Sequence, residues 1–243
     1  MVRVRGLDKS FDGRLVLGGI DLEVDAGEIL AIMGSSGGGK TTLLRCISGL
    51  ITPTRGEILV DEVDVNKEPE EARRHMGLVF QSAALFDYMN VQDNVLFGIR
   101  RQLKMSVSES AKVAHAALER VGMEDADRQK MPSELSGGMR KRVGIARALA
   151  LSPRVMLYDE PTTGLDPITA YTIDSLIVGL RKELKVTSLV VSHDVSSVFR
   201  VADRIAFLHQ GKLIFTGSPD DFAKSREESI VELIEKSQAR EFV

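Results

Sequence analysis

Residues 34–41 read Gly34-Ser35-Ser36-Gly37-Gly38-Gly39-Lys40-Thr41, which matches the pattern G-x-x-x-x-G-K-[ST] at every position. Glycines let a backbone wrap tightly enough for several N–H groups to point at one anion. In this pattern the lysine ammonium meets the β- and γ-phosphates, and the Thr41 hydroxyl is offered to Mg²⁺. An apolar run at 28–33 precedes the loop, and helical spacing at 42–47 follows it. Strand, loop and helix in this order predict a nucleoside triphosphate site rather than an ordinary glycine-rich turn.

Composition narrows the class of protein. The chain has 243 residues, of which 43% are hydrophobic and 28% charged, so it has enough apolar side chains for a globular core. The net charge of −3, the absence of Trp and the lack of basic runs with interleaved aromatics predict that nucleic acid is not a partner. A single cysteine, Cys46, excludes an internal disulfide and fits a reducing compartment. It falls in an apolar stretch, so we expect it in the core.

No apolar run approaches the roughly 18 residues that a transmembrane helix needs. The N-terminal residues 1–5 are followed by no apolar targeting segment. We therefore expect a cytosolic chain that reaches a membrane only through another protein.

The spacing of apolar residues predicts the class of fold. Alternating segments early in the chain indicate antiparallel strands with one wet face, at 2–4, 20–24 and 57–60. Helical spacing dominates from about 92 to 150. Apolar runs at 155–158 and 188–191 then flank a helical stretch at 169–184, and this alternation is typical of a parallel sheet. We expect an α/β core that is interrupted by a mostly helical insertion.

Two acidic residues, Asp159 and Glu160, end the apolar run at 155–158. Active groups of parallel sheets lie at the carboxyl ends of strands, and adjacent carboxylates are costly unless a cation is near. We therefore expect Mg²⁺ here, with Asp159 holding the metal through water and Glu160 polarising the water that attacks the γ-phosphate. The alternative is a loop that is acidic by chance.

Three further segments resemble the ATPases of the ABC family. The stretch Leu135-Ser136-Gly137-Gly138-Met139 is similar to the family's signature, except that Met139 replaces the commoner glutamine. Gln81 follows an apolar run, as the family's glutamine loop does, and His193 ends a strand, as its switch histidine does. The motifs stand in the family's order, and the resemblance covers roughly residues 2–220.

The resemblance implies a fold and a division of the chain. The fold would be an ABC-type nucleotide-binding domain, with a RecA-like P-loop core, an antiparallel β subdomain and an inserted α-helical subdomain. A single domain would fill residues 1–243, with the core at 1–82 and 151–220, the helical subdomain at 83–150 and a helical tail at 221–243. The tail contains apolar residues that predict one or two amphipathic helices, namely Phe222, Ile230, Val231, Leu233 and Ile234. We expect these helices to pack on their own cassette, and the alternative is that they pack on the other subunit.

The resemblance also implies a homodimer that binds ATP and Mg²⁺. The phosphates would lie on Gly34 to Thr42 of one chain, and the γ-phosphate would meet Ser136, Gly137 and Gly138 of the other. Two ATP molecules would thus be sandwiched between head-to-tail subunits. An ordinary helix cap is the alternative role for Ser136.

Other family positions carry expected roles. Thr41, Gln81 and Asp159 would hold the metal, while Lys40, Gln81, Glu160 and His193 would serve hydrolysis. Phe11 would stack on the adenine, and Asp166 would lie at the dimer seam. The cations that follow the signature, at 140–142 and 147, are expected on a solvated face, where they could also raise the potential near the partner's phosphates.

Several stretches resemble one subgroup, the ATPases of Mla-type phospholipid transporters, which work with MCE proteins. They are residues 79–86, 89–91, 131–134 and 166–169. This likeness implies an integral membrane permease as partner, an MCE-type lipid-binding protein in the same system, and a place on the cytoplasmic face of the inner membrane. We expect a permease helix to dock on the apolar stretch formed by residues 83–86 and Tyr88.

Alternatives share the ATP motifs. An assembly factor for iron–sulfur clusters would have soluble partners, and an importer ATPase would serve another substrate. Too few residues separate the phosphate loop from the signature for the long coiled coil of a chromosome-maintenance ATPase. A translation-factor type normally carries two cassettes in one chain, and here there is one.

Overall fold

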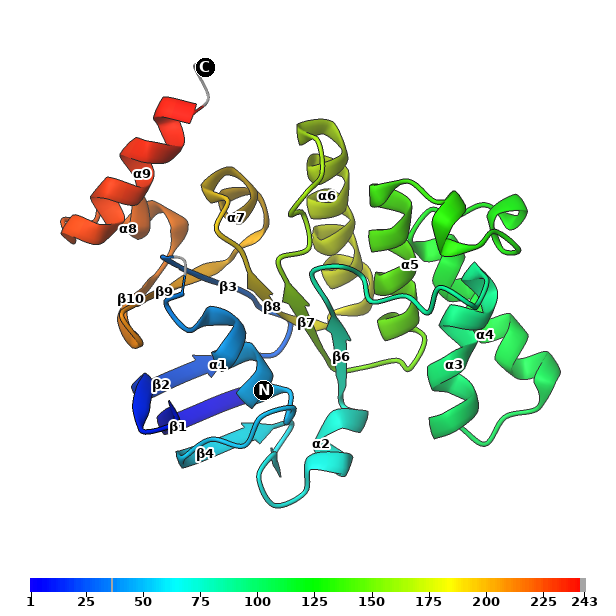
Figure 1. Cartoon of the computed structure of the whole chain (residues 1–243), viewed down its shortest axis with the longest axis horizontal. Helices are drawn as coiled ribbons and strands as arrows, with labels where there is room; N and C mark the ends of the chain where they lie inside the picture. Colours follow the sequence, from blue (N-terminus) through cyan, green and yellow to red (C-terminus); the bar gives the residue numbers. More distant parts are fainter. Residues whose placement is uncertain (36, 241–243) are drawn as a thin grey trace.

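The computed structural model of the chain describes residues 1–35 and 37–240, which form two sheets with helices around them (Figure 1). The smaller sheet is antiparallel and has the strand order β2-β1-β4-β5, and the larger sheet has the order β10-β9-β3-β8-β7-β6. The strands are β1 (Val2–Phe11), β2 (Arg14–Val24), β3 (Ile29–Gly34), β4 (Arg55–Val60), β5 (Val63–Asp64), β6 (Met76–Val79), β7 (Val155–Asp159), β8 (Thr187–Val191), β9 (Arg204–His209) and β10 (Lys212–Gly217).

Helices surround the larger sheet and extend beyond its edge at β6 (Figure 1). They are α1 (Lys40–Ile47), α2 (Pro69–Arg74), α3 (Val91–Gln102), α4 (Val107–Arg120), α5 (Gly137–Leu149), α6 (Pro167–Leu184), α7 (Val195–Val201), α8 (Pro219–Ala223) and α9 (Glu228–Arg240). Within the part of the chain that the structure describes, no helix combines the length and apolarity required to cross a bilayer.

The larger sheet is parallel except for β10, as the alternation of strands and helices predicts. Its register aligns Ile32 of β3 with Val191 of β8, and Val191 with Asp159 of β7. The segments that follow these residues therefore emerge side by side at one edge of the sheet. They are the phosphate loop, the segment with His193, and Glu160, which directly follows Asp159.

Both faces of this sheet are covered, which explains the continuous apolar runs. Along β7, Val155 and Leu157 join a buried cluster with α1 and the smaller sheet. Met156 and Tyr158 point to the other face and join a cluster with α3 to α6. Cys46 of α1 is buried in the first of these clusters, as expected.

The smaller sheet buries one face only. Val2 and Val4 of β1 lie in the core, whereas Arg3 and Arg5 between and beyond them are at least partly exposed. Alternation along the sequence therefore predicts the orientation of this sheet correctly. The helical stretch expected from about residue 92 begins with α3 at Val91, and α4 follows from Val107 with Ser106 as its cap.

The chain's last helices pack on their own cassette. Phe222 of α8 and Ile230 of α9 are fully buried in a cluster with β3, β9 and α7, and Leu233 and Ile234 lie against it. Val231, which we expected on the same apolar face, lies outside this cluster and is partly exposed.

We expect Ile230→Ala to lower the free energy of unfolding by about 2–4 kcal/mol, because it opens a cavity in a closed cluster. The matched control is Val231→Ala, one position along the same helix, which should cost less than about 1 kcal/mol since its side chain already meets water. Urea unfolding of the full chain measures both. Equal losses at the two positions would contradict the described packing of α9.

Candidate active site

One cavity brings together half of the residues predicted for ATP chemistry. It has a volume of 390 Å³, and its lining combines the phosphate loop with four other segments. The lining residues are Val16, Gly37, Gly38, Gly39, Lys40, Thr41, Thr42, Gln81, Glu160 and His193. Val16 is a site residue that the sequence did not reveal, since nothing in its neighbourhood distinguishes it from other apolar strand residues.

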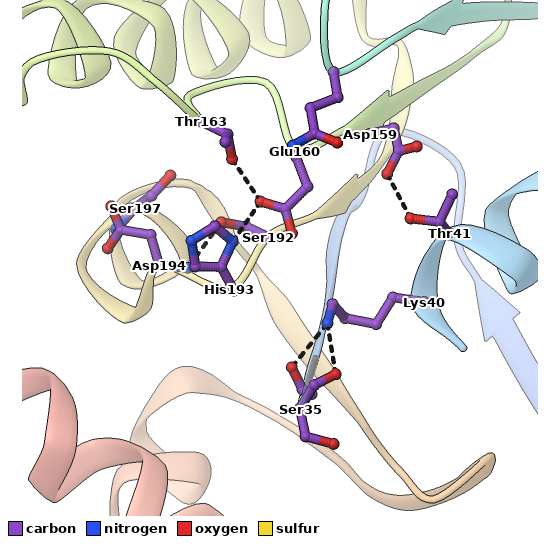
Figure 2. A network of polar contacts seen from close by, with 12 residues as sticks. Ser35, Lys40, Thr41, Asp159, Glu160, Thr163, Ser192, His193, Asp194 and Ser197 are labelled. Atoms are coloured by element: carbon purple, nitrogen blue, oxygen red, sulfur yellow. Dashed lines mark hydrogen bonds and ion pairs between the residues drawn. The ribbon is translucent and has the colours of Figure 1, made fainter. Parts of the chain in front are cut away.

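The phosphate loop is held by its own lysine. Lys40 Nζ donates hydrogen bonds of 2.9 Å to the carbonyl oxygens of Gly34 and Ser35, as Figure 2 shows for Ser35. A side chain at Gly34 is impossible, because its Cβ would lie 2.0 Å from the Leu208 carbonyl oxygen. Burial lowers the pKa of Lys40, while the carboxylates of Glu160 and Asp159 oppose that change. Ser36 lies outside the described residues.

Asp159 faces the start of α1. Its Oδ1 accepts a hydrogen bond of 3.1 Å from the Thr41 hydroxyl, so the two oxygens expected to hold Mg²⁺ are adjacent (Figure 2). Burial is the main cause that raises the pKa of Asp159. Both groups offer oxygen atoms, which are the ligands that Mg²⁺ prefers. A cation would also stabilise the charge of the poorly solvated carboxylate.

Glu160 is the next residue, and its side chain points across the site (Figure 2). Its Oε2 accepts a hydrogen bond of 2.8 Å from the Thr163 hydroxyl and lies 2.6 Å from His193 Nδ1. The backbone is in the left-handed region, with φ of 51°, and its N–H donates to the Val191 carbonyl oxygen at 2.9 Å. Strain of this kind persists only where surrounding contacts hold it, and it is common at active sites.

Comparisons with known proteins show the family to which these motifs belong. Residues 17–163 match the family model described as ABC transporter. This chain belongs to the ABC transporter family. The phospholipid transport ATP-binding protein MlaF of Haemophilus influenzae is 41% identical over 96% of this chain and 90% of its own length. The L-cystine import ATP-binding protein TcyC of Bacillus subtilis is 39% identical over 94% of this chain and 95% of its own length.

A solved structure has the same fold. The ATP-binding cassette MJ0796, solved as a dimer in a post-hydrolysis state with ADP and Pi, superposes with a TM-score of 0.83. It is 33% identical and covers 90% of this chain and 99% of its own. The chain is thus an ATPase with the ABC fold, as its motifs and their order predict.

In this ABC ATPase the signature lies away from the cavity formed by the same chain. Ser136 is exposed, and its Oγ caps α5 by accepting a hydrogen bond from the Met139 N–H. Gly138 is buried, and a Cβ there would lie 2.5 Å from Thr169 Cγ2 of α6. Gly138 is therefore required for the contact between two helices, a role that its place in the motif does not reveal.

Three other predicted residues, Gln81, Asp166 and Phe11, lie at different places relative to the cavity. Gln81 is exposed, but it lines the cavity. Asp166 caps α6 by accepting from the N–H groups of Ile168 and Thr169. Phe11 is 42% exposed at the end of β1 and outside the cavity lining, with the Lys9 ammonium 4.6 Å from its ring centre. Adenine stacking by Phe11 therefore stays a prediction.

We expected the cations after the signature to lie on a solvated face, but two of them do not. Lys141 is buried and Arg147 is half-buried. Their donor groups reach backbone carbonyl oxygens of other loops: Lys141 reaches Gln81 and Glu160, and Arg147 reaches Ala83 and Ala84. The sequence shows only a run of positive charge, and the distant carbonyl acceptors become visible only in the folded chain.

We expect Asp159→Asn to raise the thermal unfolding midpoint of the nucleotide-free chain at neutral pH, because it removes a poorly solvated charge. The pKa of Asp159 in the folded chain lies above the ordinary value of about 3.9. The gain in unfolding midpoint is therefore greatest at pH values above this raised pKa. It shrinks as the pH falls towards 3.9, since the wild-type carboxyl then becomes protonated. The affinity for ATP with Mg²⁺ should fall by about tenfold or more.

The control is Asp221→Asn at the start of α8. A hydrogen bond from Ser218 lowers the pKa of Asp221, so the ionised form stabilises the fold and its loss should lower the midpoint. A midpoint that moves in the same direction in both variants would contradict the electrostatic explanation.

Proposed function

We propose that this chain is the ATP-hydrolysing subunit of an ABC transporter and works as a homodimer that powers a membrane permease. One observation carries the proposal. The cavity joins Lys40, Thr41, Glu160 and His193, whereas the signature lies outside its lining. A single chain thus presents a nucleotide site without the signature's contacts, and a head-to-tail partner would supply them.

Each chain would bind the phosphates of ATP on the N–H groups of residues 34–42 and on the Lys40 ammonium. Lys40 would exchange its bonds to two loop carbonyls for bonds to phosphate oxygens. Thr41, Asp159 and Gln81 would hold Mg²⁺, which supplies positive charge to the β- and γ-phosphates.

Glu160 is the residue we assign to the attacking water. Thr163 and His193 both contact its Oε2, so they fix the carboxylate and leave Oε1 for the water. The water oxygen forms a bond to the γ-phosphorus, the bond to the bridging oxygen of ADP breaks, and Glu160 accepts the proton. His193 would orient Glu160 and donate to the γ-phosphate. Positioning and charge stabilisation account for most of the rate in such reactions.

The signature of the second chain would close the site. Ser136 is exposed at the N-terminus of α5, where N–H groups and the helix dipole favour an anion. Asp166 begins α6, which packs against this end of α5 through Thr169 and Gly138. The related cassette MJ0796 was solved as a dimer with ADP and Pi, which supports the proposed homodimer.

We expect Glu160→Gln to bind ATP normally and to lose turnover by about 100-fold or more, because the proton acceptor is gone. ATP should then trap a dimer of the full chain, which size-exclusion chromatography with light scattering detects. Adding Ser136→Arg to the trapped variant should return it to monomers, since a bulky cation blocks the seam. A double variant that still dimerises with ATP would contradict the shared site.

The permease would dock on an apolar groove beside the glutamine loop. The groove has a volume of 440 Å³ between the core and the helical part of the chain. Its lining includes Leu50, Phe80, Ala84, Phe86 and Phe97, and the first two are large apolar residues exposed at the surface. A cytoplasmic helix of the permease with an apolar face is the occupant we propose.

Three residues of the stretch expected to dock differ from that expectation. Ala83 is buried and does not line the groove. Leu85 is partly buried and packs against the chain's own helical core, so a charge there would damage the fold. Tyr88 is exposed but is not part of the groove lining. The proposed docking surface therefore comprises the groove residues and omits these three.

We expect Leu50→Glu to abolish co-purification of the permease from detergent-solubilised membranes, while ATP binding by the chain is unchanged. Leu50 is 51% exposed, so the charge is placed at the surface and the fold is preserved. The matched control is Val107→Glu, at an apolar residue that is 85% exposed and outside the groove, which should retain the permease. Retention by both variants would reject this docking site.

Phospholipid is the substrate class we propose, supported by the subgroup motifs and by the likeness to MlaF. The likeness to an L-cystine import protein is nearly as great, so an importer of a small solute is the rival. Mass spectrometry of the complex purified with Glu160→Gln separates the two. Bound phospholipid and an MCE-type protein support lipid transport, whereas a complex with a soluble binding protein and no lipid supports the rival. Soluble partners alone would favour an assembly factor.

A further inference from the structure

The signature helix α5 carries cations that donate to backbone carbonyl groups of several other segments. Arg142 Nη1 donates to the carbonyl oxygens of Val121 and Gly122, at 3.0 and 3.2 Å, within the helical part of the chain. Lys141, its neighbour, turns the other way and enters the core. The side chains of two adjacent residues thus hold different parts of the molecule to one helix.

Lys141 joins the two loops that carry Gln81 and Glu160. Its Nζ donates hydrogen bonds of 2.6 Å to the Gln81 carbonyl oxygen and 3.2 Å to the Glu160 carbonyl oxygen. These loops follow β6 and β7, and both side chains line the cavity with the phosphate loop. A single ammonium group therefore fixes the backbone of two residues whose side chains face the nucleotide.

The Glu160 backbone needs such support. With φ of 51°, it is in the left-handed region, which is unfavourable for a residue other than glycine. The N–H side of the residue is held by Val191 and the carbonyl side by Lys141. Loss of the Lys141 bond would free one side of the residue that we assign to the attacking water.

The charge of Lys141 is buried and is stabilised by polar partners. The residue is only 6% exposed, and an ammonium in such a place is costly unless it has partners. The two carbonyl groups supply hydrogen bonds, and the carboxylates of Asp159 and Glu160 interact favourably with its charge. A neutral, apolar side chain of the same length would fill the space without holding either loop.

The position of Lys141 on α5 connects these loops to the partner chain. Ser136 lies five residues earlier, which is about 7.5 Å along a helix. Arg147, on the same helix, holds the Ala83 and Ala84 carbonyl groups beside the permease groove. A displacement of α5 therefore acts on Gln81, on Glu160 and on the edge of the groove together.

From these contacts we infer that Lys141 is a positioning residue for ATP hydrolysis, which sets Gln81 and Glu160 relative to the signature helix. The inference rests on the proposed function of Glu160 and Gln81. When the signature engages the partner's ATP, Lys141 carries the placement of α5 to the residues that face the chain's own ATP. The residue touches no substrate and acts through the two backbone carbonyl groups.

The test uses the full chain, at concentrations where turnover per chain no longer rises with concentration. We expect Lys141→Met to lower kcat by between about 10- and 100-fold, because Gln81 and Glu160 are no longer held in position to orient the water. The KM for ATP should stay within about twofold, since the phosphate loop is untouched. With Glu160→Gln added, ATP should still trap the dimer.

Two further variants separate positioning from general stabilisation. Arg142→Met removes an equivalent pair of bonds to carbonyl groups from the next residue of α5, and it should leave kcat within about twofold of wild type. Lys141→Gln keeps an amide donor at the site and should recover a large part of the lost kcat. It also tests the inference if Lys141→Met does not fold.

Three results would overturn the role of Lys141. They are an unchanged kcat in Lys141→Met, an equal loss in Arg142→Met, and no higher kcat in Lys141→Gln than in Lys141→Met. Each of these can occur while the wild-type chain hydrolyses ATP, and the proposed function would then stand. A wild-type chain that hydrolyses no ATP, even with its permease, would overturn the proposed function and this role with it.

Discussion

The parallel alignment of β3, β8 and β7 is the constraint on which the site depends. Hydrogen-bonded register places Ile32, Val191 and Asp159 in one row, so the segments beyond them leave the sheet together. The phosphate loop, His193 and Glu160 are far apart in the sequence and meet because of this row. Burial of the strands on both faces stabilises the alignment, since a shift in register would misplace apolar side chains from both layers.

The buried lysines of the site are stabilised by hydrogen bonds to backbone carbonyl groups as well as by nearby negative charges. The ammonium groups of Lys40 and Lys141 each donate to two backbone carbonyl oxygens, and both lie in the field of Asp159 and Glu160. Burial lowers the pKa of each lysine and raises that of Asp159. These charges fit the proposed binding of ATP with Mg²⁺, because phosphate would add negative charge near the lysines and the metal would add positive charge near Asp159.

Helix α5 connects the main parts of the molecule. Its N-terminus presents Ser136, Gly138 packs against α6, and its cationic side chains hold loops of the core and of the helical part. Side chains that donate to backbone carbonyl groups hold a loop in place largely independently of that loop's own side chains. In the proposed dimer, the helix that contributes to the partner's site would in this way also hold the geometry of its own chain's site.

The sequence by itself determined the phosphate loop, the acids, the family and the class of fold. These follow from local patterns, because glycine spacing, apolar runs and strand ends are properties of neighbouring residues. It did not determine the roles of Lys141, Gly138 or Val16, nor that Leu85 packs inward. Those depend on which distant backbone lies opposite a side chain, and only tertiary packing sets that distance. The left-handed backbone of Glu160 is also decided there, because contacts from β8 and α5 are needed to hold it.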